Sequence, residues 1–225
     1  MPNGIVIIDK PQGWTSMDVC AKLRGILHEK RVGHAGTLDP MATGVLPVFV
    51  GQATKAVSFA EGGQKVYEAV LQLGLVTDTQ DTTGETLEER AVTVTENDVR
   101  AALPRFLGEI EQIPPMYSAI KRDGKNLYEL ARRGIEVTRE ARQVCVKRLA
   151  LISYENGELT FEADVSKGTY IRVLADDLAT RLGACAHLTA LRRTRVGDLS
   201  IDDAVPFSEL DDKTKSIEQR RQLLK

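Results

Sequence analysis

The sequence has no long hydrophobic run. None of its 225 residues belongs to a segment approaching the eighteen or so uninterrupted apolar residues of a membrane-spanning helix. The opening residues, MPNGIVIIDKPQGW, hold a short apolar run and then a turn, which is not the pattern of a secretory signal peptide. Internal repeats and low-complexity linkers are also lacking. These absences argue against a membrane protein and favour a globular cytoplasmic protein, long enough to bury a substantial core.

Cysteine and histidine are few and scattered. There are three of each, with no CxxC pair and no Cys/His cluster of metal-ligand spacing. An odd number of widely spaced cysteines is more typical of buried thiols in a reducing cytosol than of disulfides. We therefore expect neither a metal site nor a disulfide. The residues concerned are Cys20, Cys145, Cys185, His28, His34 and His187.

An excess of positive charge is also absent, because the net charge is −2. This value argues against a uniformly basic nucleic-acid binder, although the distribution of charge matters more than its sum. Between Pro115 and Ala150, nine basic residues outnumber four acidic ones, which leaves this stretch at +5. The stretch is either an ordinary solvated surface or a patch that neutralises phosphates.

Residues 33–55 are hard to explain by packing alone. They read GHAGTLDPMATGVLPVFVGQATK, with three glycines and a proline within a dozen residues. Glycine permits positive φ angles, and Pro40 biases Asp39 towards an extended conformation. We expect a shaped loop rather than a regular helix or a central strand, followed by a buried strand at Val45–Val50. Asp39, the only acidic residue of the stretch, is either a nucleophile or the start of an Asp-Pro turn.

This stretch resembles the signature of the TruB family of pseudouridine synthases, which modify the T-loop of transfer RNA. The pattern GHxGTLDPxATGVLP is long and of unusual composition, unlike a lone GxGxxG, and this argues against a chance match. Further family blocks match as KPxGxTS from Lys10, KxYxAxLxLGxxTDTxDxxG from Lys65 and SAxKxxGxxLYExAR from Ser118. With SKGTYIRVLADDLATRLG and AHLTALRRTRVGDL, the matching blocks extend from about Lys10 to Gly197.

The resemblance implies three catalytic residues. Asp39 would be the catalytic aspartate, and Tyr67 would stack on the target uracil, placed to take part in proton removal. Arg172 would pair with Asp39 and keep it ionised. The residues alone favour a core role for Tyr67, because aromatic side chains are common in strands and interiors. A cation in the first turn of a helix interacts unfavourably with the helix dipole, so we expect Arg172 to have an acidic partner.

Five further residues are expected to bind the substrate. By resemblance, His34 lies at the RNA-facing wall, Leu191 forms an apolar wall of the uracil pocket, and Tyr170 helps to form that pocket. Gly36 allows the RNA to approach closely, and Lys10 contacts either a phosphate or the central loop. Without the resemblance, Tyr170 is only an aromatic residue at the start of a helix, and Lys10 belongs to a turn.

Local patterns predict several elements. Ser16 is expected to cap a helix with Val19, Leu23, Ile26 and Leu27 on one face. The strand Lys65–Leu73 alternates, and Asn156-Gly157 is a strong hairpin signal. Helices are expected at 95–106, ending near Pro104, at Asn126–Arg133, ending at Gly134, at Tyr170–Leu182, and near 213–224 in a polar tail.

These elements predict a mixed α/β (α+β) domain. By resemblance it has the pseudouridine synthase fold, with a central, mainly antiparallel sheet flanked by helices and a basic, thumb-like insertion at about 115–143. We expect residues 1–225 to be the catalytic domain, without a complete C-terminal domain of PUA type. A monomer is expected, because no coiled-coil heptads are present.

The function implied is isomerisation of uridine to pseudouridine at position 55, in the T-loop of transfer RNA. The mechanism would flip the base out, depend on the aspartate and need no cofactor. The partner would be the T-stem-loop, recognised largely by its shape. Two alternatives are a non-catalytic RNA-binding module and, from Asp39-x-x-x-Thr43, an aspartyl-nucleophile phosphatase. The first would not need both Asp39 and Arg172, and the second would need another nearby carboxylate.

Overall fold

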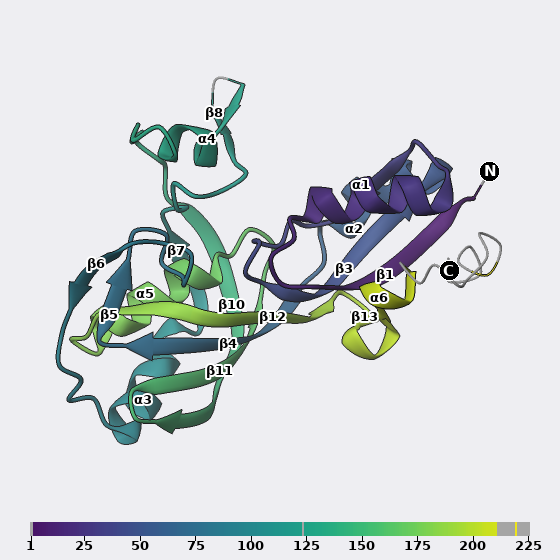
Figure 1. Ribbon diagram of the computed structural model, residues 1–225. Coiled ribbons are helices and arrows are strands. Elements are labelled where there is room, and N and C mark those ends of the chain that lie inside the picture. The colour runs from purple at the N-terminus through teal and green to yellow at the C-terminus, as the bar shows by residue number, and fades with distance from the viewer. Residues whose placement is uncertain (1, 123, 211–218, 220–225) are drawn as a thin grey trace. The chain divides into compact units, whose positions relative to one another are not determined.

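The computed structural model describes residues 2–122, 124–210 and 219 (Figure 1). The chain forms two compact units, which are described separately. Unit 1 comprises Met1–Tyr67 and Leu191–Lys225, and unit 2 comprises Glu68–Ala190. Among the described residues, no helix is both long enough and apolar enough to cross a membrane.

Unit 1 is built around the strand β3 (Thr43–Val50), whose residues from Gly44 onward are all buried. β1 (Gly4–Lys10) pairs with it antiparallel along its whole length. On its other side, β2 (Val32–His34) pairs antiparallel near its end, and β12 (Ala186–Val196) pairs parallel at its beginning. A strand covered on both faces has a continuous apolar sequence, as predicted for Val45–Val50.

The helix α1 (Ser16–Leu27) confirms the expected buried face, but the predicted cap is wrong by one residue. Thr15 is the N-cap, and it forms a capping box with Asp18. Ser16 is the first helical residue, and its side chain is buried. The Thr-x-x-Asp spacing distinguishes Thr15 from its neighbour, because the reciprocal bond requires an acceptor three residues after the cap.

The central stretch also contains more regular structure than expected. His34 ends the strand β2, and the 3-10 helix η1 (Gly51–Ala56) and the helix α2 (Val57–Ala60) follow β3. The irregular loop is therefore limited to residues 35–42, which we call the Asp39 loop.

The described part of the C-terminal tail is packed, whereas the sequence predicts a polar tail. β13 (Leu199–Ser200) pairs with β12, and β14 (Val205–Pro206) pairs parallel with β1. Between them lies η3 (Ile201–Asp203), and α6 (Phe207–Leu210) follows. The Phe207 ring contacts Trp14, with the ring centroids 4.9 Å apart. The helix expected near 213–224 lies outside the described residues.

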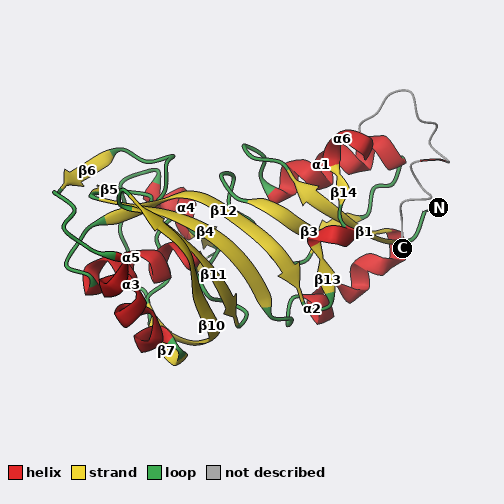
Figure 2. Cartoon of the chain, turned by 90° about the horizontal axis from the view of Figure 1, so that it is seen from below, coloured by secondary structure: helices red, strands yellow, loops and turns green. Residues whose placement is uncertain are grey.

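Unit 2 contains the strand order β4-β11-β10-β7, with β12 beside β4 (Figure 2). These strands are β4 (Lys65–Leu73), β7 (Gly108–Gln112), β10 (Arg142–Glu155) and β11 (Glu158–Val165). The β10–β11 hairpin is confirmed: Asn156 and Gly157 have φ angles of 51° and 82°, as a type I′ turn requires. The pairings are mainly antiparallel, with parallel pairs at β1–β14 and β3–β12, so the predicted mixed fold class is confirmed.

The helices of unit 2 also follow the sequence patterns. α5 (Ile171–Arg181) buries one apolar face, and α3 (Glu96–Ala102) carries a capping box formed by Thr95 and Asp98. The chain tightens into η2 (Leu103–Phe106) at Pro104. A small hairpin consists of β5 (Leu75–Thr77) and β6 (Thr86–Glu89).

The basic segment at 115–143 forms a separate small structure in unit 2. It contains β8 (Lys121–Arg122), β9 (Lys125–Asn126) and α4 (Leu127–Ala131). Figure 1 shows β8 and α4 projecting away from the sheet of this unit. The short helix and its end near Gly134, where φ is +68°, are confirmed. The Asp123-Gly124 pair also predicts a turn, but Asp123 lies outside the described residues.

Candidate active site

The Asp39 loop connects β2 to β3 in unit 1, and Asp39 is half-buried within it. The backbone carbonyl of Asp39 accepts a hydrogen bond from the Ala42 N–H at 3.1 Å, which closes a turn after the aspartate. Gly36 has a φ angle of +77°, a conformation that favours glycine. The loop therefore contains the turn that one interpretation of Asp-Pro predicted, and it also places a carboxylate there.

Arg193 of β12 holds the beginning of this loop. Its Nη2 donates to the Gly36 carbonyl at 3.0 Å and its Nη1 to the Thr37 carbonyl at 3.5 Å. Its Nε donates to the Val45 carbonyl, beyond the loop, at 2.8 Å. The side chain is fully buried. A single guanidinium thus joins the chain before Asp39 to the chain after it.

The segment that follows β1 holds the middle of the loop. The Ser16 hydroxyl accepts from the Leu38 N–H at 2.9 Å and donates to the Leu38 carbonyl at 3.3 Å. The Gly13 N–H donates to the Pro40 carbonyl at 2.8 Å. Lys10 Nζ also reaches that carbonyl, at 3.4 Å, and donates to two carbonyls of its own segment, Pro11 at 2.9 Å and Trp14 at 2.6 Å.

The KPxGxTS block therefore contacts the signature loop directly. Together with Arg193 and the turn at Asp39, this block supplies a hydrogen-bond donor to every backbone carbonyl from Gly36 to Pro40. Of the two roles considered for Lys10, the structure shows the loop contact, since its buried amine donates to three carbonyls. A loop whose successive carbonyls are each held by a donor presents its side chains in a defined direction.

Burial changes the titration of two residues beside the loop. It lowers the pKa of Lys10 from 10.5 to about 8, and the Asp39 carboxylate acts in the opposite direction. It also lowers the pKa of His34 below its usual value of 6.5, and the nearby charge of Arg193 lowers it further. Within the described part of the chain, His34 Nδ1 is buried without a hydrogen-bond partner. Burial and the charge of Arg193 thus both favour the neutral imidazole.

Tyr67 and Leu191 lie on the neighbouring strands β4 and β12, and each side chain is 7% exposed. Tyr67 lies on the same buried strand face as Ala69, Leu71 and Leu73, as predicted from the strand pattern. Leu191 and Arg193 are two residues apart in β12 and so point to the same face. The strand face that bears the predicted pocket wall also bears the arginine that holds the Asp39 loop.

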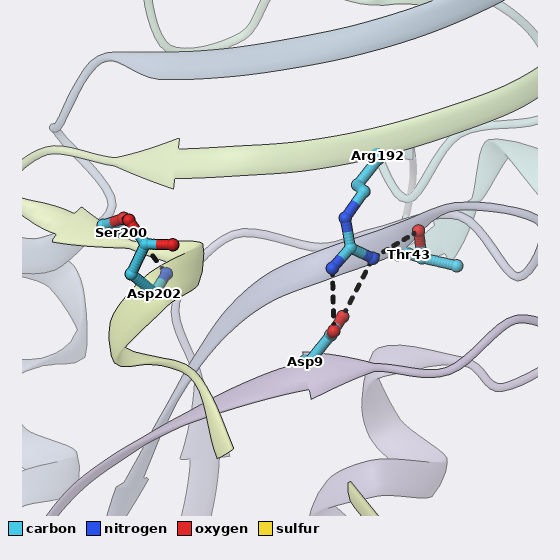
Figure 3. A network of polar contacts seen from close by, with 5 residues as sticks. All are labelled: Asp9, Thr43, Arg192, Ser200 and Asp202. Carbon is cyan, nitrogen blue, oxygen red and sulfur yellow. Dashed lines mark hydrogen bonds and ion pairs between the residues drawn. The ribbon is translucent and has the colours of Figure 1, made fainter. Parts of the chain in front are cut away.

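Arg192 points to the other face of β12 and forms a second polar network (Figure 3). Its guanidinium binds Asp9 of β1 through two contacts, at 2.8 and 3.2 Å, and the Thr43 hydroxyl at 3.2 Å. This network ties together three strands at the point where β3 leaves the Asp39 loop. The ion pair lines a cavity of about 470 Å³, together with Trp14 and Phe207.

Tyr170 and Arg172 lie in unit 2, at the start of α5. The Gln112 side chain binds the Tyr170 backbone twice, accepting from its N–H at 3.0 Å and donating to its carbonyl at 3.2 Å. Buried Arg172 donates to the Thr79 carbonyl at 3.0 Å and to the Tyr117 carbonyl at 2.7 Å. The pairing of Arg172 with Asp39 remains a prediction.

Three residues that organise these regions are not predicted in these roles by the sequence: Arg193, Gln112 and Ser16, which was expected only to cap a helix. Arg193 lies within the matching block AHLTALRRTRVGDL. A signal was available, because a residue two positions from a predicted pocket wall shares its strand face. No local pattern indicates Gln112, since its partner Tyr170 is 58 residues away.

Two family models match the chain. The model of the TruB family pseudouridylate synthase (N terminal domain) matches residues 24–171, and that of the tRNA pseudouridylate synthase B C-terminal domain matches residues 172–225. A tRNA pseudouridine synthase B of Ectopseudomonas mendocina is 49% identical over 209 residues, covering 93% of this chain and 68% of that protein. One of Burkholderia mallei is 48% identical over 213 residues, covering 95% and 70%.

Solved structures are also similar to this chain. The crystal structure of a Cbf5-Nop10-Gar1 complex matches with a TM-score of 0.75 and 28% identity, covering 99% of this chain and 59% of the matched one. The structure of an H/ACA RNP bound to a substrate RNA containing 2′-deoxyuridine matches with a TM-score of 0.71 and 27% identity, covering 97% and 57%. The chain thus spans less than two thirds of these solved chains.

Proposed function

We propose, because this chain belongs to the TruB family of pseudouridylate synthases, that it isomerises uridine to pseudouridine in transfer RNA. We place the target at position 55, in the T-loop. The observation that carries the proposal is the Asp39 loop, in which a lone carboxylate stands on a backbone held at every carbonyl from Gly36 to Pro40. Such support suits a group that must be aimed at one atom.

The reaction breaks the bond between the ribose and N1 of uracil and forms a bond from the same ribose carbon to C5. The proton on C5 is lost and N1 gains one, so neither oxidation nor net hydrolysis occurs and no cofactor is required. Asp39 acts as the nucleophile at the ribose carbon or at the uracil ring, or it initiates elimination. All three routes need an ionised carboxylate, and we assign Arg172 as its partner.

The substrate must leave its stack before a side chain can reach it, at a cost of a few kcal/mol. We propose that His34 fills the space that the base leaves, which suits a half-buried imidazole whose surroundings favour the neutral form. Tyr67 stacks on the flipped uracil and takes part in removing the C5 proton. Leu191 and Tyr170 form the pocket walls.

The proposed partner is the T-stem-loop of transfer RNA, bound by a monomer in the cytoplasm. Glycine at position 36 allows the RNA to come close to the loop. The basic segment at 115–143 contributes phosphate contacts, which give affinity without reading the sequence.

The test is tritium release from transfer RNA labelled at C5 of uracil, comparing the wild type with Asp39→Asn. We expect release at the T-loop uridine by the wild type and a fall of at least about 1,000-fold in the variant. Bound RNA without release from the wild type would contradict the proposal and favour a binding module. Release of inorganic phosphate from a general phosphoester would favour the phosphatase alternative.

A further inference from the structure

We propose that Arg193 is the positioning residue for Asp39, acting through the backbone of the Asp39 loop. The inference rests on the proposed function, because it assigns to Asp39 a direction that the reaction needs. Arg193 touches neither the ribose nor the base in this proposal. Its contribution is to fix the part of the chain that carries the carboxylate.

The contacts of Arg193 enclose the aspartate in the sequence. Gly36 and Thr37 precede Asp39, whereas Val45 follows it, and all three carbonyls accept from one planar guanidinium. The separation of the two ends of the loop is thus set by the rigid fork of a single side chain. Arginine offers five donors in a fixed plane, while lysine offers three from one atom.

Two glycines allow the neighbouring chain to pack closely against Arg193. A Cβ at Gly44 would lie 2.2 Å from the backbone oxygen of Arg193, so only glycine lets β3 come this close to β12. A Cβ at Gly36 would lie 3.4 Å from Nη1 of Arg193, at the edge of ordinary contact. Both the backbone and the side chain of Arg193 are therefore packed against the loop or its exit.

Burial of this guanidinium is not explained by simple packing. A buried charge is expensive unless it is fully hydrogen-bonded, and apolar residues often fill such positions equally well. Every side-chain hydrogen bond described for Arg193 is donated to a backbone carbonyl, either of the loop or of β3. Its charge also reaches the site, since it lowers the pKa of His34 and opposes protonation of Lys10.

The experiment measures single-turnover tritium release at saturating enzyme, for Arg193→Ala and Arg193→Lys. We expect the rate constant to fall by about 100-fold in Arg193→Ala, as a displacement of about 1 Å can cause, with RNA affinity within about threefold of the wild type. Arg193→Lys keeps the charge but cannot span the three carbonyls, so it should be impaired to a similar degree. Added guanidinium ion should restore part of the rate of Arg193→Ala.

The matched control is Arg195→Ala, on the same strand but exposed, which should keep the wild-type rate constant. A lower yield of folded protein would change the enzyme concentration needed for saturation but not the rate constant at saturation. If Arg193→Ala does not fold, Arg193→Lys decides alone. Hydrogen exchange of the peptide covering residues 35–42 should become faster in either variant.

Wild-type rate constants in both Arg193 variants would overturn the proposal. So would full restoration by lysine, because charge rather than positioning would then be responsible. Failure of the proposed function is a different result: the wild type itself would release no tritium. In that case unchanged hydrogen exchange in the Arg193 variants would also refute the positioning of the loop.

Discussion

The Asp39 loop of unit 1 and the start of α5 in unit 2 are both held by buried polar side chains, but by different kinds. The loop presents a row of carbonyls, and its donors include two buried cations, Arg193 and Lys10. The start of α5 presents an N–H and a carbonyl on Tyr170, and the neutral amide of Gln112 satisfies both. Backbone groups that need a side-chain partner, such as the Tyr170 N–H and the carbonyls of Gly36 and Thr37, thus determine which kind of side chain is buried beside them.

This difference has an electrostatic consequence. A buried amide contributes the same hydrogen bonds at any moderate pH, whereas a buried amine depends on its protonation. Burial lowers the pKa of Lys10 to about 8, so Lys10 is the pH-sensitive support of the loop. The comparison can be tested by changing the support in each unit.

Gly44→Ala should have the largest effect. Its φ angle is +101°, and the new Cβ would lie 2.2 Å from the Arg193 backbone oxygen, so strands β3 and β12 would have to separate. We expect a loss of about 3 kcal/mol or more in the free energy of unfolding, measured with urea.

Gly183→Ala in unit 2 is the matched control. Its φ angle is +70°, but no atom lies within 4 Å of the added Cβ. Only backbone strain remains, and we expect a loss of about 1 kcal/mol. Equal losses at the two positions would show that the close approach beside the Asp39 loop is not rigid.

Gln112→Leu should have the next largest effect. It leaves the Tyr170 N–H and carbonyl without the amide, and we expect a loss of about 2 kcal/mol in the free energy of unfolding. Gln112→Glu keeps an acceptor for the N–H but, when ionised, has no donor for the carbonyl. At neutral pH its loss should be at least as large as that of Gln112→Leu, because a buried carboxylate would face the Tyr170 carbonyl. At low pH, where the carboxyl is protonated and again offers a donor, the variant should approach the wild type. A Gln112→Glu variant insensitive to pH would contradict the account of this region.

The sequence predicted what depends on local patterns. The alternating strand Lys65–Leu73, the Asn156-Gly157 turn and the helix after Tyr170 follow from side-chain period and turn chemistry, which act over a few residues. The prediction of Ser16 as the helix cap is wrong, although the spacing of Asp18 indicates Thr15. Within the site, the signature of the family identified the loop.

The supports of the loop could not be predicted in the same way. Arg193 and the Gly36 carbonyl are separated by 157 positions, and a carbonyl acceptor is common to all residues, so the sequence does not name the partner. The packing of the tail is a similar case. Ile201 and Ala204 pack against the core residues Ile7 and Val45, which only the folded chain brings near them.

A change in the protonation of Lys10 should have the smallest effect of these tests. This effect should be specific to the Asp39 loop. Its pKa is about 8 in the folded protein and 10.5 in the unfolded chain. Between these values the unfolded chain binds the proton and the folded protein does not, so the contribution of Lys10 to stability rises with pH across this window. Deprotonation also removes one of the three N–H donors, and the Pro40 carbonyl, at 3.4 Å, is the longest contact.

We therefore expect the single-turnover rate constant to fall about threefold as the pH rises through 8, by loss of one weak hydrogen bond. Lys10→Met should have a lower rate at pH 7 and lack this decrease. Deprotonation of RNA bases would affect both proteins equally, so their ratio isolates Lys10. A ratio that stays constant from pH 7 to 9.5 would mean that the loop, like the start of α5, is held independently of protonation.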